Sequence, residues 1–240
     1  MTITETEIWE RFNTHKSFLI EAKWLEQIYS LSLSYELRST IGERLGLSAE
    51  QGWKVINLLI KEHGSQPELI KAAGLCHQTE ARDFLLKLLR EQEKPEINTV
   101  KALACWGAIL PIHELKRILN DNSMNMRLAG LQLLNFKLHR LETTQILDLV
   151  HDLLHDFREE VVIQVIKLLQ RRDEEKIINT ISNAAKNGTD EIVKVALIAL
   201  GSIGTKYSSI ILTQLSLDLT NEKHREIAKI QLSHQYLQDS

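Results

Sequence analysis

The sequence predicts an all-α fold, a right-handed α-solenoid of stacked helical hairpins, on three observations. The 240-residue chain has only three prolines and ten glycines, while Leu, Ile, Lys, Glu and Gln dominate, a composition that favours helices. Between residues 189 and 214, Val193, Ala196, Leu197 and Leu200 form one apolar stripe at helical spacing, and a second amphipathic run follows. This two-helix unit recurs, in degenerate form, through the C-terminal two-thirds of the chain.

The first 46 residues are expected to form two or three helices, over 5–12, 17–31 and 34–45, the last closed by Gly46. About half of the aromatic side chains gather here: Trp9, Phe12, Phe18, Trp24, Tyr29 and Tyr35. Because the terminal unit of a solenoid must seal its apolar face, we interpret this region as a cap. A partner-binding aromatic patch is the alternative.

The next helix is expected to begin at Ser48, which forms a capping-box pattern with Gln51, and to stop at His63-Gly64. Its buried stripe would consist of Trp53, Ile56, Leu59 and Ile60.

From residue 65 the pattern becomes one of helix pairs. The first helices are expected over 66–76, 97–109, 124–138, 159–170 and 190–201, the last able to end in a left-handed cap at Gly201 or Gly204. The second helices share an i, i+4 apolar pair: Leu85/Leu89, Leu115/Leu119, Ile146/Val150, Ile177/Ile181 and Ile211/Leu215. The second members are 30, 31, 31 and 34 residues apart. Such hairpins bury their apolar faces only against their neighbours. The predicted organisation is a capping region over 1–64, about five helix pairs over 65–219 and a polar, solvent-facing closing helix within 220–240.

These helix pairs resemble HEAT repeats, in the short form of the phycobilisome-lyase HEAT-like family of E/F-type phycobilin lyases. The segment Leu197 to Gly204 is similar to the family's A-L-G-x-I-G turn, and Ala72 to Leu75 with Glu80-Ala81 resembles a second copy. The valine-arginine pair near the start of the first helices is kept poorly, Met126-Arg127 and Val193-Lys194 being the nearest matches. The resemblance covers roughly residues 65–219.

Composition excludes several classes of function. A formal charge of −3 gives no reason to expect nucleic-acid binding, and the acidic series Asp148, Asp152 and Asp156 opposes a basic DNA groove. The acidic start lacks a secretory signal and no uncharged apolar run could span a bilayer, so we expect a cytoplasmic protein that does not enter membranes. Two cysteines are too few for a disulfide framework.

No residue constellation predicts catalysis. His151 and His155 are four residues apart on one side of a helix, as metal ligands can be, but Asp152 stands where a zincin needs Glu, so we expect surface histidines and no metal. A thiolate at Cys76 assisted by His77 is the alternative to a buried thiol. Dinucleotide-binding, Walker and nucleophile-elbow motifs are absent.

The predicted binding surface is the concave face, which second helices usually line in a curved solenoid. The residues two positions before the second member of each apolar pair, together with their outward neighbours, are expected to form this groove. It would be basic at the early repeats, acidic in the middle and neutral at the end. Besides Thr213, its residues are Lys87, Arg90, Arg117, Asp148, Asp152, His155, Asn179, Asn183 and Lys186. Plain solvated helix faces are the alternative.

Two hypotheses of function follow. The first is an interaction scaffold or chaperone-like adaptor that binds another protein and needs no cofactor. The resemblance implies the second, a lyase subunit that attaches, removes or isomerises a phycobilin on a phycobiliprotein cysteine, with a related HEAT-like subunit as partner. Speculative bilin contacts in that case are Trp106, Phe136, Arg117 and Arg127.

Overall fold

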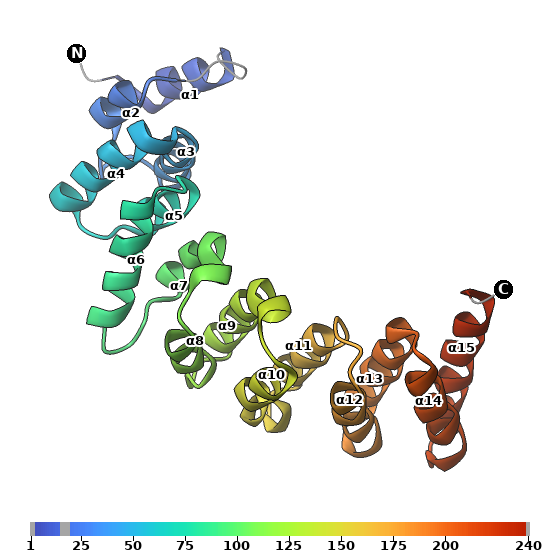
Figure 1. The fold of residues 1–240 in the computed structure, drawn as a ribbon. Coiled ribbons are helices and arrows are strands. Elements are labelled where there is room, and N and C mark those ends of the chain that lie inside the picture. Colours follow the sequence, from blue (N-terminus) through green and yellow to red (C-terminus); the bar gives the residue numbers. More distant parts are fainter. Residues whose placement is uncertain (1–2, 15–19, 239–240) are drawn as a thin grey trace. The chain divides into compact units, whose positions relative to one another are not determined.

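The computed structural model describes residues 3–14 and 20–238, and these form helices joined by short loops, with no strand among them. This confirms the all-α prediction. The chain divides into two compact units, unit 1 (Met1–Leu110) and unit 2 (Pro111–Ser240), each described by itself below (Figure 1).

Unit 1 is built from successive helices that pack in pairs. Its elements are α1 (Glu5–Thr14), α2 (Ala22–Ile28), α3 (Tyr35–Leu47), α4 (Ala49–His63), α5 (Pro67–Leu75), α6 (Thr79–Glu91), α7 (Ile97–Ala102) and the 3₁₀ helix η1 (Leu103–Ile109). Helix α5 packs between α3 and α7, while α4 and α6 each cover α5 from their own hairpin. The helix expected over 17–31 ends earlier than predicted, at Ile28. The helix expected over 97–109 changes to 3₁₀ geometry after Ala102.

Trp9, Phe12 and Trp24 pack against one another in the N-terminal region. Phe12 is buried, and its ring meets the rings of Trp9 and Trp24 edge-on, with 5.9 Å between centroids in each case. The guanidinium of Arg44 lies 4.5 Å from the Phe12 centroid. Tyr35, at 55% exposed, stands outside this cluster, and Phe18 lies outside the described residues.

Two expectations about the ends of α3 and α4 were wrong. Gly46 does not close α3 but lies inside it, where a Cβ would come within 2.7 Å of the Leu75 Cβ, so glycine lets α3 approach α5. Ser48 makes no capping bond; its hydroxyl donates to the carbonyl of Arg44 at 2.9 Å because Ser48 still continues the turn of α3. Gly64, at φ 80°, ends α4 as predicted.

Unit 2 contains two layers of helices. Its elements are α8 (Ile112–Leu119), α9 (Met124–Lys137), η2 (Leu138–Arg140), α10 (Thr143–Val150), η3 (Asp152–His155), α11 (Glu159–Leu169), α12 (Glu175–Asn187), α13 (Asp190–Ile203), α14 (Lys206–Asp218) and α15 (Glu222–Gln238). Helices α9, α11, α13 and α15 pack side by side as the first-helix layer, and α8, α10, α12 and α14 form the second-helix layer (Figure 1). Gly204, at φ 68°, ends α13 in the left-handed conformation, whereas Gly201 lies within the helix.

The apolar pairs of the second helices face the core in four of the five predicted units, where every member is fully buried. In α14 the prediction was off by three residues. Ile211 is only half-buried, whereas Ser208 and Leu212 are 0% exposed. With Leu212 as the second member after Leu89, Leu119, Val150 and Ile181, the spacings become 30, 31, 31 and 31 residues.

Charged side chains in the loops hold successive repeats of unit 2 together. The buried carboxylate of Asp156 accepts from Arg127 Nη1 at 2.6 Å and from Arg158 Nε at 2.7 Å. Arg158 and Arg127 lower the pKa of Asp156 from 3.8 to about 2, against the opposing effect of its burial. One repeat later, Arg172 pairs with Glu174 and donates to the carbonyl of Leu138 at 2.8 Å.

Helix α15 closes the C-terminal end of unit 2 by packing on α13 and α14. The buried amide of Gln235 donates to the carbonyls of Leu200 and Gly201 at 3.1 and 2.9 Å. The expectation of a solvent-facing polar surface is partly wrong, because His224 is 9% exposed and its Nε2 lies 3.5 Å from Asp190 Oδ1.

Among the helices of residues 3–14 and 20–238, none has both the length and the apolar composition of a membrane span.

Candidate partner-binding surfaces

The nine residues predicted to bind a partner divide between the two units. Lys87 and Arg90 lie on α6 of unit 1. The other seven lie on the second-helix layer of unit 2: Arg117 on α8, Asp148 on α10, Asp152 and His155 on η3, and Asn179, Asn183 and Lys186 on α12. All nine are exposed or half-exposed. That they bind a partner stays a prediction.

Several of these side chains interact with their own neighbours. Lys87 Nζ lies 3.6 Å from Glu91 Oε1, on the same exposed helix face. Arg117 Nη1 lies 3.9 Å from the buried Glu114. Asn179 accepts a hydrogen bond from the Tyr207 hydroxyl at 3.0 Å, which links α12 to α14.

His155 and Asn183 are the two predicted residues that line a shared depression. This α10–α12 hollow has a volume of about 570 Å³ and lies between α10, η3 and α12. It is lined by Leu147, His151, Leu154, His155, Asp156, Val162, Thr180, Asn183, Ala184, Asn187, Gly188, Thr189 and Ile192. Sequence reasoning placed the two residues on one face but missed Asn187 and Thr180, which lie one turn away from Asn183.

The α10–α12 hollow combines an apolar floor with a polar rim. Leu154 and Ala184 are half-buried and Val162 is buried, whereas Asn183 and His155 are exposed. Phe157, which follows the lining residue Asp156 in the chain, is 88% exposed. An apolar floor with a few polar groups at its edge is the usual composition of a binding pocket.

The two histidines at this rim contact each other and Asp152. The rings of His151 and His155 lie edge to face with centroids 5.5 Å apart, and His151 Nδ1 is 3.0 Å from Asp152 Oδ1. Across the part of the chain that the structure describes, no three His, Cys, Asp or Glu side chains are placed to hold a metal ion.

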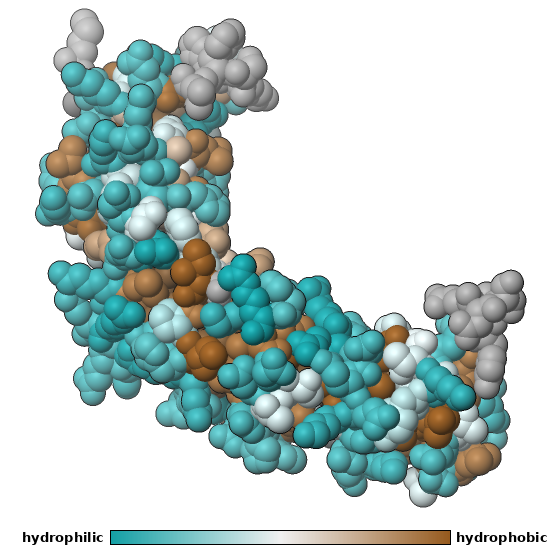
Figure 2. Space-filling view, in the orientation of Figure 1, coloured by the Kyte–Doolittle hydropathy of each residue, from teal (hydrophilic) through white to brown (hydrophobic). Residues whose placement is uncertain are grey.

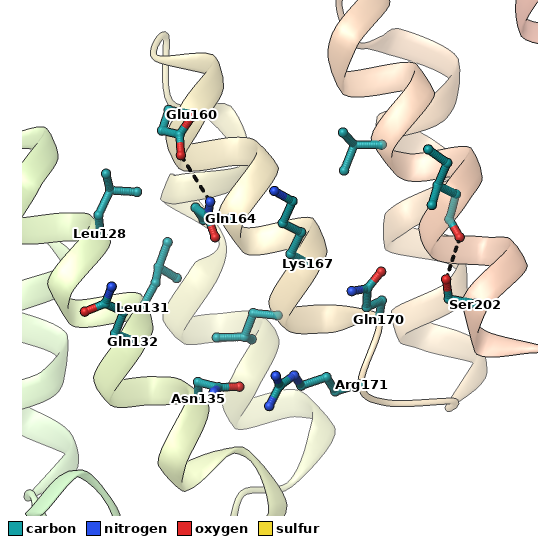
Figure 3. A pocket seen from close by; sticks show the side chains of 13 residues that line it. Leu128, Leu131, Gln132, Asn135, Glu160, Gln164, Lys167, Gln170, Arg171 and Ser202 are labelled. Atoms are coloured by element: carbon teal, nitrogen blue, oxygen red, sulfur yellow. Dashed lines mark hydrogen bonds between the residues drawn. The ribbon is translucent and has the colours of Figure 1, made fainter. Parts of the chain in front are cut away.

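A second depression crosses the opposite layer. This α9–α11–α13 groove has a volume of about 680 Å³. It is lined by Leu128, Leu131, Gln132, Asn135, Glu160, Gln164, Lys167, Leu168, Gln170, Arg171, Val195, Ile198 and Ser202. Figure 3 shows the side chains of Asn135 and Arg171 extending toward one another from α9 and from the end of α11.

Sequence reasoning missed this groove because it assigned binding to the second helices. A signal was present: Gln132 and Ile198 each lie eight residues after the first residue of their helix, α9 and α13. Ile198 is 40% exposed although it lies in a largely apolar helix. On the face shown in Figure 2, such hydrophobic side chains appear as patches among hydrophilic ones.

The thiol considered as a nucleophile is in an environment that keeps it protonated. Cys76 is 1% exposed and its Sγ donates to the carbonyl of Ala73 at 3.1 Å. Burial raises the pKa of Cys76. The ring of His77 packs instead against Trp106, with centroids 5.5 Å apart. Cys76 is therefore a core residue.

No protein-family model matches this sequence, and neither does any curated protein sequence. YibA of Escherichia coli has a similar structure, with a TM-score of 0.59 at 16% identity over 96% of this chain and 93% of YibA. A HEAT-like repeats protein from the archaeon Thermococcus onnurineus NA1 gives a TM-score of 0.50 at 16% identity, over 92% of this chain and 99% of the other. The complex of CpcE and CpcF of phycocyanin lyase from Nostoc sp. PCC7120 gives only 0.48 at 12% identity, over 89% of this chain and 94% of the matched one. The first two likenesses support a HEAT-like α-solenoid fold, and no comparison shows the lyase family.

Proposed function

We propose that this chain is a protein-binding scaffold that holds a partner protein on the second-helix layer of unit 2. The α10–α12 hollow is the observation that carries the proposal. It is an open depression of about 570 Å³ with an apolar floor, on a fold that exposes two extended helical layers.

The hollow suits an apolar anchor side chain of the partner. Leu154 and Ala184 would surround the anchor, while the amides of Asn183 and Asn187 would pair with polar groups around it. Protein interfaces draw most of their binding energy from a few such buried anchors with a polar rim.

A photo-crosslinking amino acid at Asn183 tests this proposal. It is expected to capture a partner that, once purified, binds the wild-type chain in solution. Ala184→Arg, which fills the hollow with a charged side chain, should weaken that binding by about thirtyfold or more if the anchor is a hot spot. Ser233→Arg is the matched control, because it adds the same charge at an exposed position of α15, outside the second-helix layer. Equal affinities of the wild type and Ala184→Arg would refute the proposed site.

The phycobilin-lyase alternative rests on the sequence resemblance alone. Arg127, one of the speculative bilin contacts, forms an ion pair with the buried Asp156. This ion pair makes Arg127 a poor candidate to bind a bilin propionate. Phe136, at 49% exposed, remains accessible. Purification from a phycobilisome-containing cell decides the matter: bilin absorbance and a phycobiliprotein in the eluate would favour the lyase, and a colourless eluate would dismiss it.

A further inference from the structure

We propose that the α9–α11–α13 groove binds an extended, acidic segment of a partner protein. This site lies on the first-helix layer, opposite the second-helix layer discussed above, and goes beyond the proposed function. Its distinguishing feature is a positive charge at one end, from the exposed Lys167 and Arg171.

Lys167 and Arg171 are both exposed, line the groove, and make no ion pair within residues 3–14 and 20–238. Lys167 lies in the last turn of α11, and Arg171 lies two residues beyond the end of that helix. Acidic groups of a ligand would compensate the positive charge at this end of the groove.

The other lining residues place no negative charge near Lys167 and Arg171. The lining residues of α9 are leucines and amides, and those of α13 are Val195, Ile198 and Ser202. Glu160 is the one carboxylate among the lining residues, and it accepts from Gln164 Nε2 at 3.1 Å. Glu160 and Lys167 are seven residues apart, which is about 10 Å along the helix. The cationic end of the groove therefore requires acidic groups from a ligand.

Three features favour a peptide over a polyanion. The side-chain amides of Gln132 and Asn135 each offer donors and an acceptor, as peptide groups do. The exposed Ile198 can contact apolar side chains that alternate with acidic ones along an extended chain. Two cations alone make a weak site for a nucleic-acid backbone, which needs many basic contacts.

Fluorescence anisotropy with labelled model peptides tests the proposal on the full chain. The probe is a short peptide in which Leu alternates with Glu, compared with counterparts that carry Gln or Lys in place of Glu. The acidic peptide is expected to bind about tenfold more tightly than the Gln peptide, and the preference should weaken as salt rises. Equal affinities, or preference for the Lys peptide, would overturn the proposal.

Charge reversal then locates the site. Lys167→Glu with Arg171→Glu should abolish the preference for acidic peptide. The matched control, Lys176→Glu with Lys206→Glu, changes the net charge equally at exposed positions of α12 and α14 and should leave the preference intact. If the groove variant misfolds, protection of the α11 amides from hydrogen exchange by the acidic peptide on the wild type replaces it, and unchanged exchange overturns the proposal.

Two further comparisons separate the alternatives. Binding of oligodeoxythymidine through the same two cations, as tightly as the acidic peptide, would overturn a peptide site in favour of a nucleic-acid site. Ala184→Arg, on the other layer, should not alter binding of the acidic peptide. Loss of peptide binding in that variant would refute the assignment to this groove.

Discussion

Replacing Asp156 with asparagine removes a negative charge from between two arginines in the core of a repeat junction. The Asp156 carboxylate is 0% exposed, and it accepts from Arg127 at 2.6 Å and from Arg158 at 2.7 and 2.8 Å. Asparagine keeps the shape and one acceptor oxygen, so the change removes mainly the charge. Arg127 and Arg158, at 18% and 17% exposed, would then be left only partly compensated.

The magnitude follows from the pKa of Asp156. Its fall from 3.8 to about 2 means that the folded protein favours the ionised form. Each pKa unit corresponds to about 1.4 kcal/mol, so the ionised carboxylate contributes roughly 2 kcal/mol to the stability of unit 2 at neutral pH. We expect Asp156→Asn to lower the free energy of unfolding of unit 2 by about that amount.

The contribution of Asp156 to stability is expected to decrease as the pH falls. Because the folded pKa is depressed, the contribution is complete above the ordinary pKa near 3.8 and disappears as the pH falls through about 2. The difference between wild type and Asp156→Asn should therefore be constant from pH 7 to 5 and fall to about half at pH 3. Urea unfolding followed by circular dichroism measures it.

Tryptophan fluorescence reports the unfolding of unit 1, because all four tryptophans belong to it: Trp9, Trp24, Trp53 and Trp106. It therefore serves as an internal reference that Asp156→Asn should leave unchanged. Asp152→Asn is the matched control: its side chain is 79% exposed, and its removal should leave the unfolding midpoint of unit 2 unchanged. A loss in Asp156→Asn that stays the same down to pH 3 would refute the electrostatic reasoning, since it would come from packing alone.

Two more substitutions test the close contacts within each unit. Gly74→Ala would place a Cβ 2.5 Å from the carbonyl oxygen of Ala102, so overpacking between α5 and α7 should cost about 1–3 kcal/mol. Tryptophan fluorescence in urea follows unit 1, and an unchanged midpoint would contradict this expectation. Gln235→Ala removes both hydrogen bonds to the carbonyls of α13, which should cost about 1–3 kcal/mol and speed amide exchange in α15. His234→Ala, an exposed neighbour, should leave that exchange as it is.

The helical pattern could be predicted wherever apolar residues alone occupied the buried positions. Val193, Ala196, Leu197 and Leu200 are all at most 4% exposed, as their spacing indicated. The pattern failed at α14 because Ser208, a polar residue, takes a core position there. Its hydroxyl donates a hydrogen bond to the Thr205 carbonyl at 2.8 Å, which allows it to be buried. A pattern of apolar and polar residues does not predict such a bond.

The binding surfaces were less predictable than the helices. Periodicity shows which side of one helix is exposed, and it placed His155 and Asn183 on the same face. It does not show which exposed positions of neighbouring repeats meet around a depression. Gln132, Lys167 and Ile198 come together in one groove only because α9, α11 and α13 pack side by side.

The way α15 closes unit 2 has a consequence for how such a chain can change in length. Gln235 and the apolar face of α15 pack on α13 and α14, the hairpin that directly precedes α15 in the chain. A hairpin duplicated before α13 would meet the same neighbours on both sides that existing hairpins meet. Duplication would lengthen both layers by one step and leave the terminal closure as it stands.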